Sequence, residues 1–300
     1  MIVALTGATG FVGTALLKLL IEYGHRVRAL TRRSRTERDG IAWIDGALDD
    51  HAALAVLCSG ADVAIHVAGV VNAPDAAGFD AGNRMGTVAM LGAAEAAGIV
   101  RFVHVSSLAA REPQLSMYGA AKRAGEDAVV ASSLDWRVVR PPAVYGPGDT
   151  ELLDMYRAAR FGLLPLPPGG RTSVIHVDDL ARFIVTLATQ GETRAIYEID
   201  DGVTGGWSHQ EFANAIGDAV GRRVRTIALP RRLLALGAAI DGVVRGTSAK
   251  LTPDRVAYIA HPDWVADPAL RPPIALWEPR IATAAGLRAT AAWYREHGWL

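Results

Sequence analysis

Cysteine is nearly absent from this 300-residue sequence, and Cys58 is the only one. A single thiol excludes an intramolecular disulfide and a cysteine-rich zinc site. The eight histidines show no His-Glu-x-x-His spacing, so no metal site is predicted. Lysine plus arginine (31) balance aspartate plus glutamate (31), and this zero net charge argues against a nucleic-acid partner.

Long hydrophobic runs are also missing. The longest, Leu233–Val244, is short and contains Asp241, whereas a membrane span needs about 20 apolar residues. The N-terminus shows no basic segment followed by an apolar one, so no targeting signal is predicted. The 50% hydrophobic content argues against a disordered chain. We expect a cytoplasmic protein without a membrane span.

Strand-like and helix-like segments alternate in the first half of the chain. Apolar runs predict strands at Ile2–Thr6, Arg26–Thr31, Ile41–Ile44, Asp62–Val67, Arg101–Val105 and Trp136–Arg140. Helical periodicity predicts helices at Phe11–Tyr23, Phe79–Ala97 and Met117–Ala131. This alternation predicts the α/β class, with a doubly wound parallel sheet covered by helices on both faces.

The second half is interrupted repeatedly by proline and glycine after Arg140. Helices are predicted at about 177–189, 208–219, 230–245 and 279–297, with short strands at 196–199 and 224–227. We expect a smaller C-terminal α+β lobe.

The glycine-rich turn Gly7–Gly13 leaves a predicted strand and enters a predicted helix. Its first glycine permits a tight turn, Gly10 lets the backbone approach a pyrophosphate, and Gly13 lets the helix pack closely on the strand. Amides at the start of the helix then face the phosphates. The residues of this turn expected to bind a cofactor are Gly7, Thr9, Gly10, Phe11, Val12 and Gly13.

The turn and the alternating pattern together predict a Rossmann-type fold. We place a dinucleotide-binding domain at residues 1–150 and a substrate-binding lobe at 151–300. Chain segments are expected to exchange between the two.

The end of the second strand bears on the choice of cofactor. Thr31 occupies the position where an NAD-selective site usually carries a carboxylate, and Arg32 can pair with a 2′-phosphate and stack on adenine. We therefore expect Arg32 and Arg33 to contact the cofactor, which favours NADP while NAD stays open. The alternative is that these arginines belong to a solvated basic loop.

Tyr118 and Lys122 form a Tyr-x-x-x-Lys pair on a predicted helix. The i, i+4 spacing places both side chains on one face, and an ammonium there lowers the pKa of the phenol from about 10 toward neutral. Tyr118 is thus a candidate general acid, and Lys122 can also hydrogen-bond the nicotinamide ribose. The strand Arg101–Val105 ends in two serines, whose hydroxyls can orient a substrate oxygen.

The Gly-x-x-Gly-x-x-Gly turn and this order of Ser, Tyr and Lys resemble the short-chain dehydrogenase/reductase superfamily. The resemblance is strongest to its extended and atypical branches, which are NAD-dependent epimerase/dehydratase-like. Further matches are His66–Gly69, Asn83–Thr87, Arg140–Asp149 and Ile175–Ala181. The resemblance selects Ser107, Tyr118 and Lys122 as the catalytic residues. As further cofactor contacts it implies Leu48, Ala68, Gly69, Asn83, Tyr118, Lys122, Pro141 and Val144.

The resemblance implies hydride transfer between a nicotinamide and a carbonyl or secondary alcohol carbon, and relatives are often homodimers. Two alternatives stay open: a sugar-nucleotide epimerase or dehydratase with bound NAD, and a non-catalytic NADP-binding assembly or accessory protein. Ser107 is followed by Leu-Ala-Ala, which departs from the Val-Tyr-Gly ending of the sugar-nucleotide enzymes. Ala47 also stands where many relatives carry an adenine-contacting Asp.

The substrate is expected to be a small molecule with hydrophobic character. The apolar segments Phe161–Pro168 and Leu233–Val244 would suit a hydrophobic carbonyl compound, or they are core of the lobe. The arginines between 222 and 232 could face a phosphate or an anionic lipid, or they are solvated surface.

Overall fold

The computed structural model describes residues 1–36, 39–246 and 252–300, and the chain divides into two compact units. The first unit comprises Met1–Pro141, Leu180–Glu198 and Leu270–Trp277. The second comprises Pro142–Asp179, Ile199–Ala269 and Glu278–Leu300. The chain therefore passes between the two units repeatedly.

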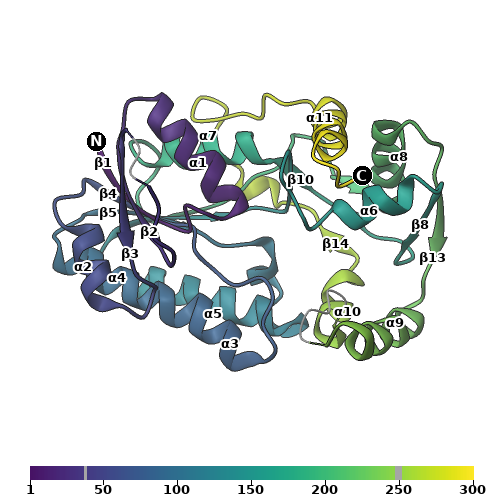
Figure 1. The fold of residues 1–300 in the computed structure, drawn as a ribbon, viewed down its shortest axis with the longest axis horizontal. Coiled ribbons are helices and arrows are strands. Elements are labelled where there is room, and N and C mark those ends of the chain that lie inside the picture. Colours follow the sequence, from purple (N-terminus) through teal and green to yellow (C-terminus); the bar gives the residue numbers. More distant parts are fainter. Residues whose placement is uncertain (37–38, 247–251) are drawn as a thin grey trace. The chain divides into compact units, whose positions relative to one another are not determined.

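A seven-stranded sheet forms the centre of the first unit (Figure 1), and every neighbouring pair in it is parallel. The strand order is β11-β6-β5-β4-β1-β2-β3. The strands are β1 (Ile2–Thr6), β2 (Arg26–Thr31), β3 (Ile41–Asp45), β4 (Val63–His66), β5 (Arg101–Val105), β6 (Asp135–Arg140) and β11 (Ala195–Glu198). The chain runs outward from β1 in both directions, so β1 and β4 flank the switch point at which such sheets bind ligands.

Helices cover both faces of this sheet (Figure 1). One face carries α1 (Phe11–Glu22) and the part of α7 (Val177–Leu187) from Leu180 onward. The other face carries α2 (His51–Cys58), α4 (Gly86–Ala96) and α5 (Met117–Ala131). Strand residues Phe102, Trp136 and Val138 are buried beneath those helices. The predicted α/β class with a doubly wound, Rossmann-type parallel sheet is confirmed.

The helix expected over Phe79–Ala97 is divided in the structure. It consists of α3 (Ala76–Asp80), a π-helical turn η1 (Ala81–Met85) and α4. A π turn changes the hydrogen-bond spacing without changing the apolar pattern much, so periodicity did not reveal it. The short helix α2 was also missed, because its eight residues are apolar on several sides.

The second unit contains short strands and several helices. Its strand pairs are β7 (Ala143–Tyr145) with β10 (Val174–His176), and β8 (Leu163–Leu166) with β13 (Arg225–Ala228). A further small sheet consists of β12 (Trp207–Ser208), β9 (Arg171–Thr172) and β14 (Asp263–Trp264). The helices are α6 (Leu153–Ala159), α8 (His209–Val220), α9 (Arg231–Arg245), α10 (Pro253–Ile259) and α11 (Thr283–Glu296).

Aromatic side chains fill the core of the second unit. Tyr145, Tyr156 and Tyr294 are fully buried, and the rings of Tyr156 and Tyr294 meet edge to face with centroids 5.1 Å apart. The predicted helix at 208–219 corresponds to α8, which starts with a reciprocal capping pair between Ser208 and Glu211. The short helices α6 and α10 were not predicted.

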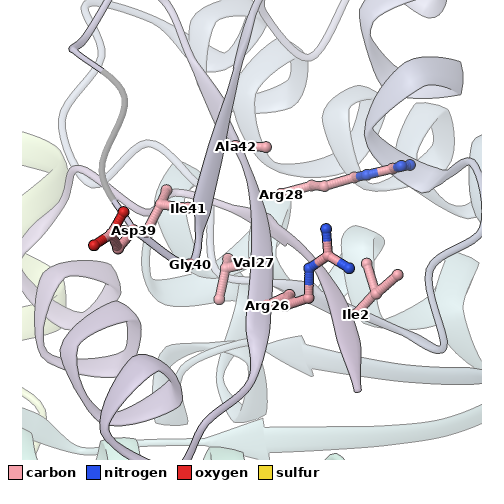
Figure 2. Close-up of a pocket in the computed structure, with 8 residues that line it drawn as sticks. All are labelled: Ile2, Arg26, Val27, Arg28, Asp39, Gly40, Ile41 and Ala42. Carbon is pink, nitrogen blue, oxygen red and sulfur yellow. The ribbon is translucent and has the colours of Figure 1, made fainter.

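A pocket of 390 Å³ lies at the amino-terminal ends of β1, β2 and β3 (Figure 2). It is lined by Ile2, Arg26, Val27, Arg28, Asp39, Gly40, Ile41 and Ala42. Ligands of open parallel sheets bind at the opposite, carboxyl-terminal strand ends, so this pocket is not a candidate cofactor site. Within the described ranges, no helix is both long and apolar enough to cross a bilayer.

Candidate active site

The glycine turn joins β1 to α1 at the switch point of the sheet. Gly7 has φ +74°, and a Cβ there would lie 2.6 Å from the backbone nitrogen of Ala68. A Cβ at Gly13 would overlap the Gly7 carbonyl oxygen. Both positions therefore require glycine, one for its backbone angle and close approach and the other for the packing of α1 on the turn.

Gly10 is different, because nothing in the protein crowds it. A Cβ there would meet only the Gly7 carbonyl oxygen, at 3.4 Å, and the residue is exposed. As the N-cap of α1, Gly10 also offers no side chain to the first-turn amides. An open cradle over a helix N-terminus fits the diphosphate of a dinucleotide, so the predicted turn residues suit that group.

The loop after β2 carries the arginines proposed to choose the cofactor. Arg32 and Arg33 are exposed, and Thr31 is buried with its hydroxyl donating to the Arg33 carbonyl at 2.8 Å. The Arg35 guanidinium lies 5.2 Å from the centre of the Trp43 ring. Arg32, Arg33 and Arg35 are thus all exposed beside the end of β2, and Arg35 differs in lying over the Trp43 ring.

The segment after β4 is fixed by Asn83 of the π turn. The side-chain amide of Asn83 exchanges two hydrogen bonds with the backbone of Val70, both 3.0 Å long, and Asn83 is buried. A Cβ at Gly69 would lie 2.8 Å from Oδ1 of Asn83 and 3.8 Å from Nζ of Lys122. Gly69, Asn83 and Lys122 are therefore brought together, and Ala68 touches the glycine turn.

Leu48 packs on the first residue of α4. A Cβ at Gly86 would lie 2.5 Å from Cδ1 of Leu48, so the Leu48 side chain rests directly on the backbone at this glycine. Leu48 is half-buried against the core of the first unit.

Helix α5 positions Tyr118 and Lys122. Ser116 caps the helix by accepting a hydrogen bond from the Gly119 amide at 3.0 Å. The Tyr118 ring packs against Phe79, with centroids 6.2 Å apart. The ammonium of Lys122 is buried and donates to the Val105 carbonyl at 2.8 Å.

Burial lowers the pKa of Lys122 to about 8, and the nearby Glu126 carboxylate opposes that shift. Such a cation changes its charge near neutral pH, which an exposed lysine does not do.

Ser107 begins the 3-10 helix η2 (Leu108–Arg111), and its Oγ accepts a hydrogen bond from the Ala109 amide at 3.2 Å. A Cβ at Gly119 would lie 2.8 Å from the Ala109 carbonyl oxygen. The turn that carries Ser107 therefore lies against the first turn of α5, which carries Tyr118. The neighbouring Ser106 hydroxyl is buried without a hydrogen-bond partner.

Pro141 directly follows β6 and lies beside this turn. Its carbonyl oxygen accepts a hydrogen bond from the Leu108 amide at 3.0 Å. Val144 belongs to β7 in the second unit and is half-buried there.

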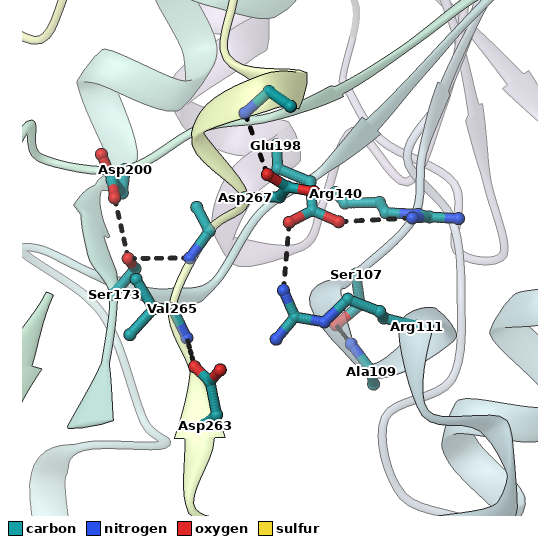
Figure 3. A network of polar contacts seen from close by, with 12 residues as sticks. Ser107, Ala109, Arg111, Arg140, Ser173, Glu198, Asp200, Asp263, Val265 and Asp267 are labelled. Atoms are coloured by element: carbon teal, nitrogen blue, oxygen red, sulfur yellow. Dashed lines mark hydrogen bonds and ion pairs between the residues drawn. The ribbon is translucent and has the colours of Figure 1, made fainter. Parts of the chain in front are cut away.

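Two glutamates and two arginines form a network of ion pairs that includes Glu126, one helical turn after Lys122 on α5. The sequence motifs did not predict this network. The Arg140 guanidinium pairs with Glu126 of α5 at 2.6 Å and with Glu198 of β11 at 3.3 Å. Glu198 also pairs with Arg111 of η2 at 3.3 Å (Figure 3). One sequence feature could have pointed to Glu126 as part of this network. Tyr118, Lys122 and Glu126 follow one another at intervals of four residues, which places all three on one face of α5.

Two buried histidines, His66 and His104, lie side by side within reach of the Lys122 charge. His66 bonds the hydroxyls of Thr6 at 2.7 Å and Thr87 at 3.2 Å, and its ring stacks on His104 with centroids 5.4 Å apart. Burial, followed by the charge of Lys122, lowers the pKa of His66 to about 3. Burial, followed by the charges of Lys122 and His66, lowers the pKa of His104 as well, so burial favours the neutral form of both rings. Among the described residues no cluster of potential metal ligands occurs.

A glycine turn at the switch point of a parallel sheet, with a tyrosine and a buried lysine on α5, is the arrangement expected of a dinucleotide-binding α/β enzyme. The NAD dependent epimerase/dehydratase family matches residues 3–200, and the chain belongs to this family. Membership confirms the expected extended branch of the short-chain dehydrogenase/reductase superfamily. It also confirms an oxidoreductase-type enzyme that uses a nicotinamide cofactor.

Two relatives are similar to this chain in sequence, and one solved structure is similar to it in fold. The chain is 40% identical to "Ceramide reductase" of Caulobacter vibrioides (strain NA1000 / CB15N) over 309 residues, covering 100% of this chain and 96% of that protein. It is 32% identical to "4-hydroxy-2-methyl-3-oxo-4-farnesyl-3,4-dihydroquinoline-1-oxide ketoreductase" of Stigmatella aurantiaca, covering 66% of this chain and 67% of that protein. "MoeE5 in complex with UDP-glucuronic acid and NAD" shares the fold, with a TM-score of 0.73, 20% identity and 99% coverage of both chains.

Proposed function

We propose that this protein is an NADPH-dependent ketoreductase acting on a long-chain, ceramide-like lipid or a similarly apolar ketone. The observation that carries the proposal is the buried Lys122 ammonium, which shares one face of α5 with Tyr118 next to the Ser107 turn.

Each of the three residues has a separate task in this proposal. Ser107 donates a hydrogen bond to the ketone oxygen and orients it. Tyr118 donates its proton to that oxygen as the carbonyl becomes an alcohol. The Lys122 ammonium stabilises the phenolate that Tyr118 becomes, and solvent then restores the proton. A reduced nicotinamide, when bound, supplies the hydride that completes the alcohol.

The substrate class rests on the relatives and on apolar surface. The two named reductases act on a ceramide and on a farnesyl-bearing quinoline, both of which combine a polar centre with a long apolar part. In the second unit, Phe161 is 83% exposed and is followed by Leu163 in β8. Exposed apolar groups of this size are typical of surfaces that meet an apolar partner.

The preference for NADPH rests on charge at the end of β2. Thr31 offers no carboxylate to repel a 2′-phosphate, and Arg32 and Arg33 are exposed beside it. Leu48 and Val144 complete the proposed contacts to the adenine and nicotinamide ends.

The decisive experiment compares Tyr118→Phe with the wild-type enzyme on a long-chain keto-amide, following NADPH absorbance. We expect turnover to fall by about 100-fold or more, because the phenol proton is lost while the ring packing on Phe79 is kept. NADPH binding, measured by tryptophan fluorescence, should change little. Full turnover by Tyr118→Phe would contradict the proposed catalytic role.

A sugar-nucleotide epimerase is the second candidate, because the family description names epimerases and a protein of the same fold is seen in complex with UDP-glucuronic acid and NAD. It predicts NAD that stays bound through purification and turnover of a UDP-sugar without added cofactor. The Leu-Ala-Ala sequence after Ser107 favours the reductase instead.

A further inference from the structure

Helix α9 has two apolar faces, of which only one is buried. Leu234 and Ala238 pack with Val256 of α10 in a small core, with Leu229 against it. On the rest of the helix the large apolar side chains are exposed: Leu233 by 51%, Leu236 by 58%, Ile240 by 56%, Val243 by 87% and Val244 by 75%.

These five exposed residues, called here the α9 stripe, form one continuous band. Their spacing of three, four, three and one residues confines them to about 100° of the helix circumference, away from Leu234 and Ala238. A surface helix normally turns polar residues outward, so the α9 stripe is not explained by the packing of the second unit.

The chain segment Gly221–Gly246, which leads into α9 and includes it, is strongly basic in sequence. Between Gly221 and Gly246 the only acidic residue is Asp241, whereas the basic residues number six: Arg222, Arg223, Arg225, Arg231, Arg232 and Arg245. Of these, Arg222, Arg223, Arg225 and Arg232 are exposed. This segment therefore combines a net charge of about +5 with an apolar band.

Strand β13, which precedes α9, and its partner β8 also expose apolar and basic side chains. β13 pairs in parallel with β8, and this register places Arg225 opposite Leu163. Leu163 and Ile227 are 46% and 47% exposed. This ribbon thus adds one exposed arginine, Arg225, and two part-exposed apolar side chains to the segment.

We propose that the α9 stripe docks this protein onto an anionic lipid bilayer, lying in the plane of the interface. An amphipathic helix of this kind buries its apolar side among the acyl chains, while arginines meet the lipid phosphates. A second copy of the chain fits the patch less well, because a two-fold contact would oppose two clusters of like charge. This surface goes beyond the proposed reductase function and does not depend on it.

The test is co-sedimentation of the full-length protein with vesicles, once with phosphatidylglycerol and phosphatidylcholine and once with phosphatidylcholine alone. We expect binding to the anionic vesicles that weakens as salt is raised, and much weaker binding to the neutral ones. The double variant L236E/I240E should lose about tenfold or more of the anionic binding. The variant R222Q/R223Q should reduce it and flatten its salt dependence.

Val100→Glu is the matched control, since Val100 is 68% exposed in the first unit and lies outside the α9 segment. It should bind vesicles as the wild type does. Thermal unfolding of each variant checks that the fold is kept, which is expected because every changed side chain is exposed.

Three results would overturn the proposal: no binding of the wild type to anionic vesicles, equal loss in the control, or full binding by L236E/I240E. A wild-type dimer that L236E/I240E converts to a monomer, without vesicle binding, would assign the stripe to self-association instead. Because sedimentation needs neither cofactor nor turnover, its failure leaves the reductase proposal to its own assay.

Discussion

At the scale of single residues, the charge of Lys122 governs the proposed chemistry. Its ammonium lies in a water-poor site with one carbonyl partner, Val105, and burial lowers its pKa to about 8. Below that pH the lysine is charged and can stabilise a phenolate, and above it the charge is lost.

We therefore predict that kcat/KM for ketone reduction falls above about pH 8 as Lys122 loses its proton. A pH profile from 6 to 10 measures this limb. Lys122→Arg is the comparison, because arginine keeps its charge throughout that range. A limb that is unchanged in Lys122→Arg would assign the titration to another group, and a flat wild-type profile would contradict the prediction.

The second residue-scale prediction concerns Arg32. Replacement by serine should weaken NADPH binding about 10- to 100-fold, the usual worth of one charge-assisted contact to a phosphate, and leave NADH binding nearly unchanged. Fluorescence titration with both cofactors measures the difference. Arg35→Ser is the control, because Arg35 lies over Trp43. If the wild type binds NADH as tightly as NADPH, the Arg32 argument is wrong.

At the scale of elements, the glycine turn keeps its conformation only because α1 can pack closely against the end of β1. Gly13→Ala would push a Cβ into the Gly7 carbonyl oxygen. We expect a loss of about 1–3 kcal/mol in stability and the loss of stabilisation by NADPH, since the turn must shift.

Gly92 is the control for Gly13, because it also lies in a helix but has free space around it. It lies exposed in α4, and a Cβ at this position would meet nothing within 4 Å, so Gly92→Ala should stabilise the protein by about 0.5–1 kcal/mol. Thermal unfolding with and without NADPH tests both variants. Undiminished NADPH stabilisation of Gly13→Ala would show that the turn tolerates the side chain.

At the scale of the whole molecule, Glu198 joins parts of the chain that are far apart in sequence. Its side chain is fully buried between Arg140 and Arg111. Glu198→Gln leaves two cations without their shared carboxylate, and we expect a cost of about 3–5 kcal/mol in unfolding free energy. Denaturant unfolding measures it.

Asp127→Asn is the control for that experiment, since Asp127 forms an exposed i, i+4 pair with Arg123. Its removal should cost less than about 0.5 kcal/mol. Equal costs for the two substitutions would mean that the buried charges do not hold the strands and helices together.

The sequence alone was sufficient for features that depend on neighbours along the chain. Strands follow from short continuous apolar runs and helices from an apolar period of 3.6 residues, and the Gly7–Gly13 turn follows from local backbone geometry. The pairing of Tyr118 with Lys122 on one side of α5 is local for the same reason. The α/β class, the family and the enzyme type were therefore predictable.

Tertiary structure alone decided the features that join distant segments. It buried Lys122 under the Val105 carbonyl, linked Glu126 to Glu198 through Arg140, and turned most of the apolar run Leu233–Val244 outward instead of into the core. Sequence patterns specify which faces are apolar, but what covers each face depends on the packing of elements that are remote in the chain.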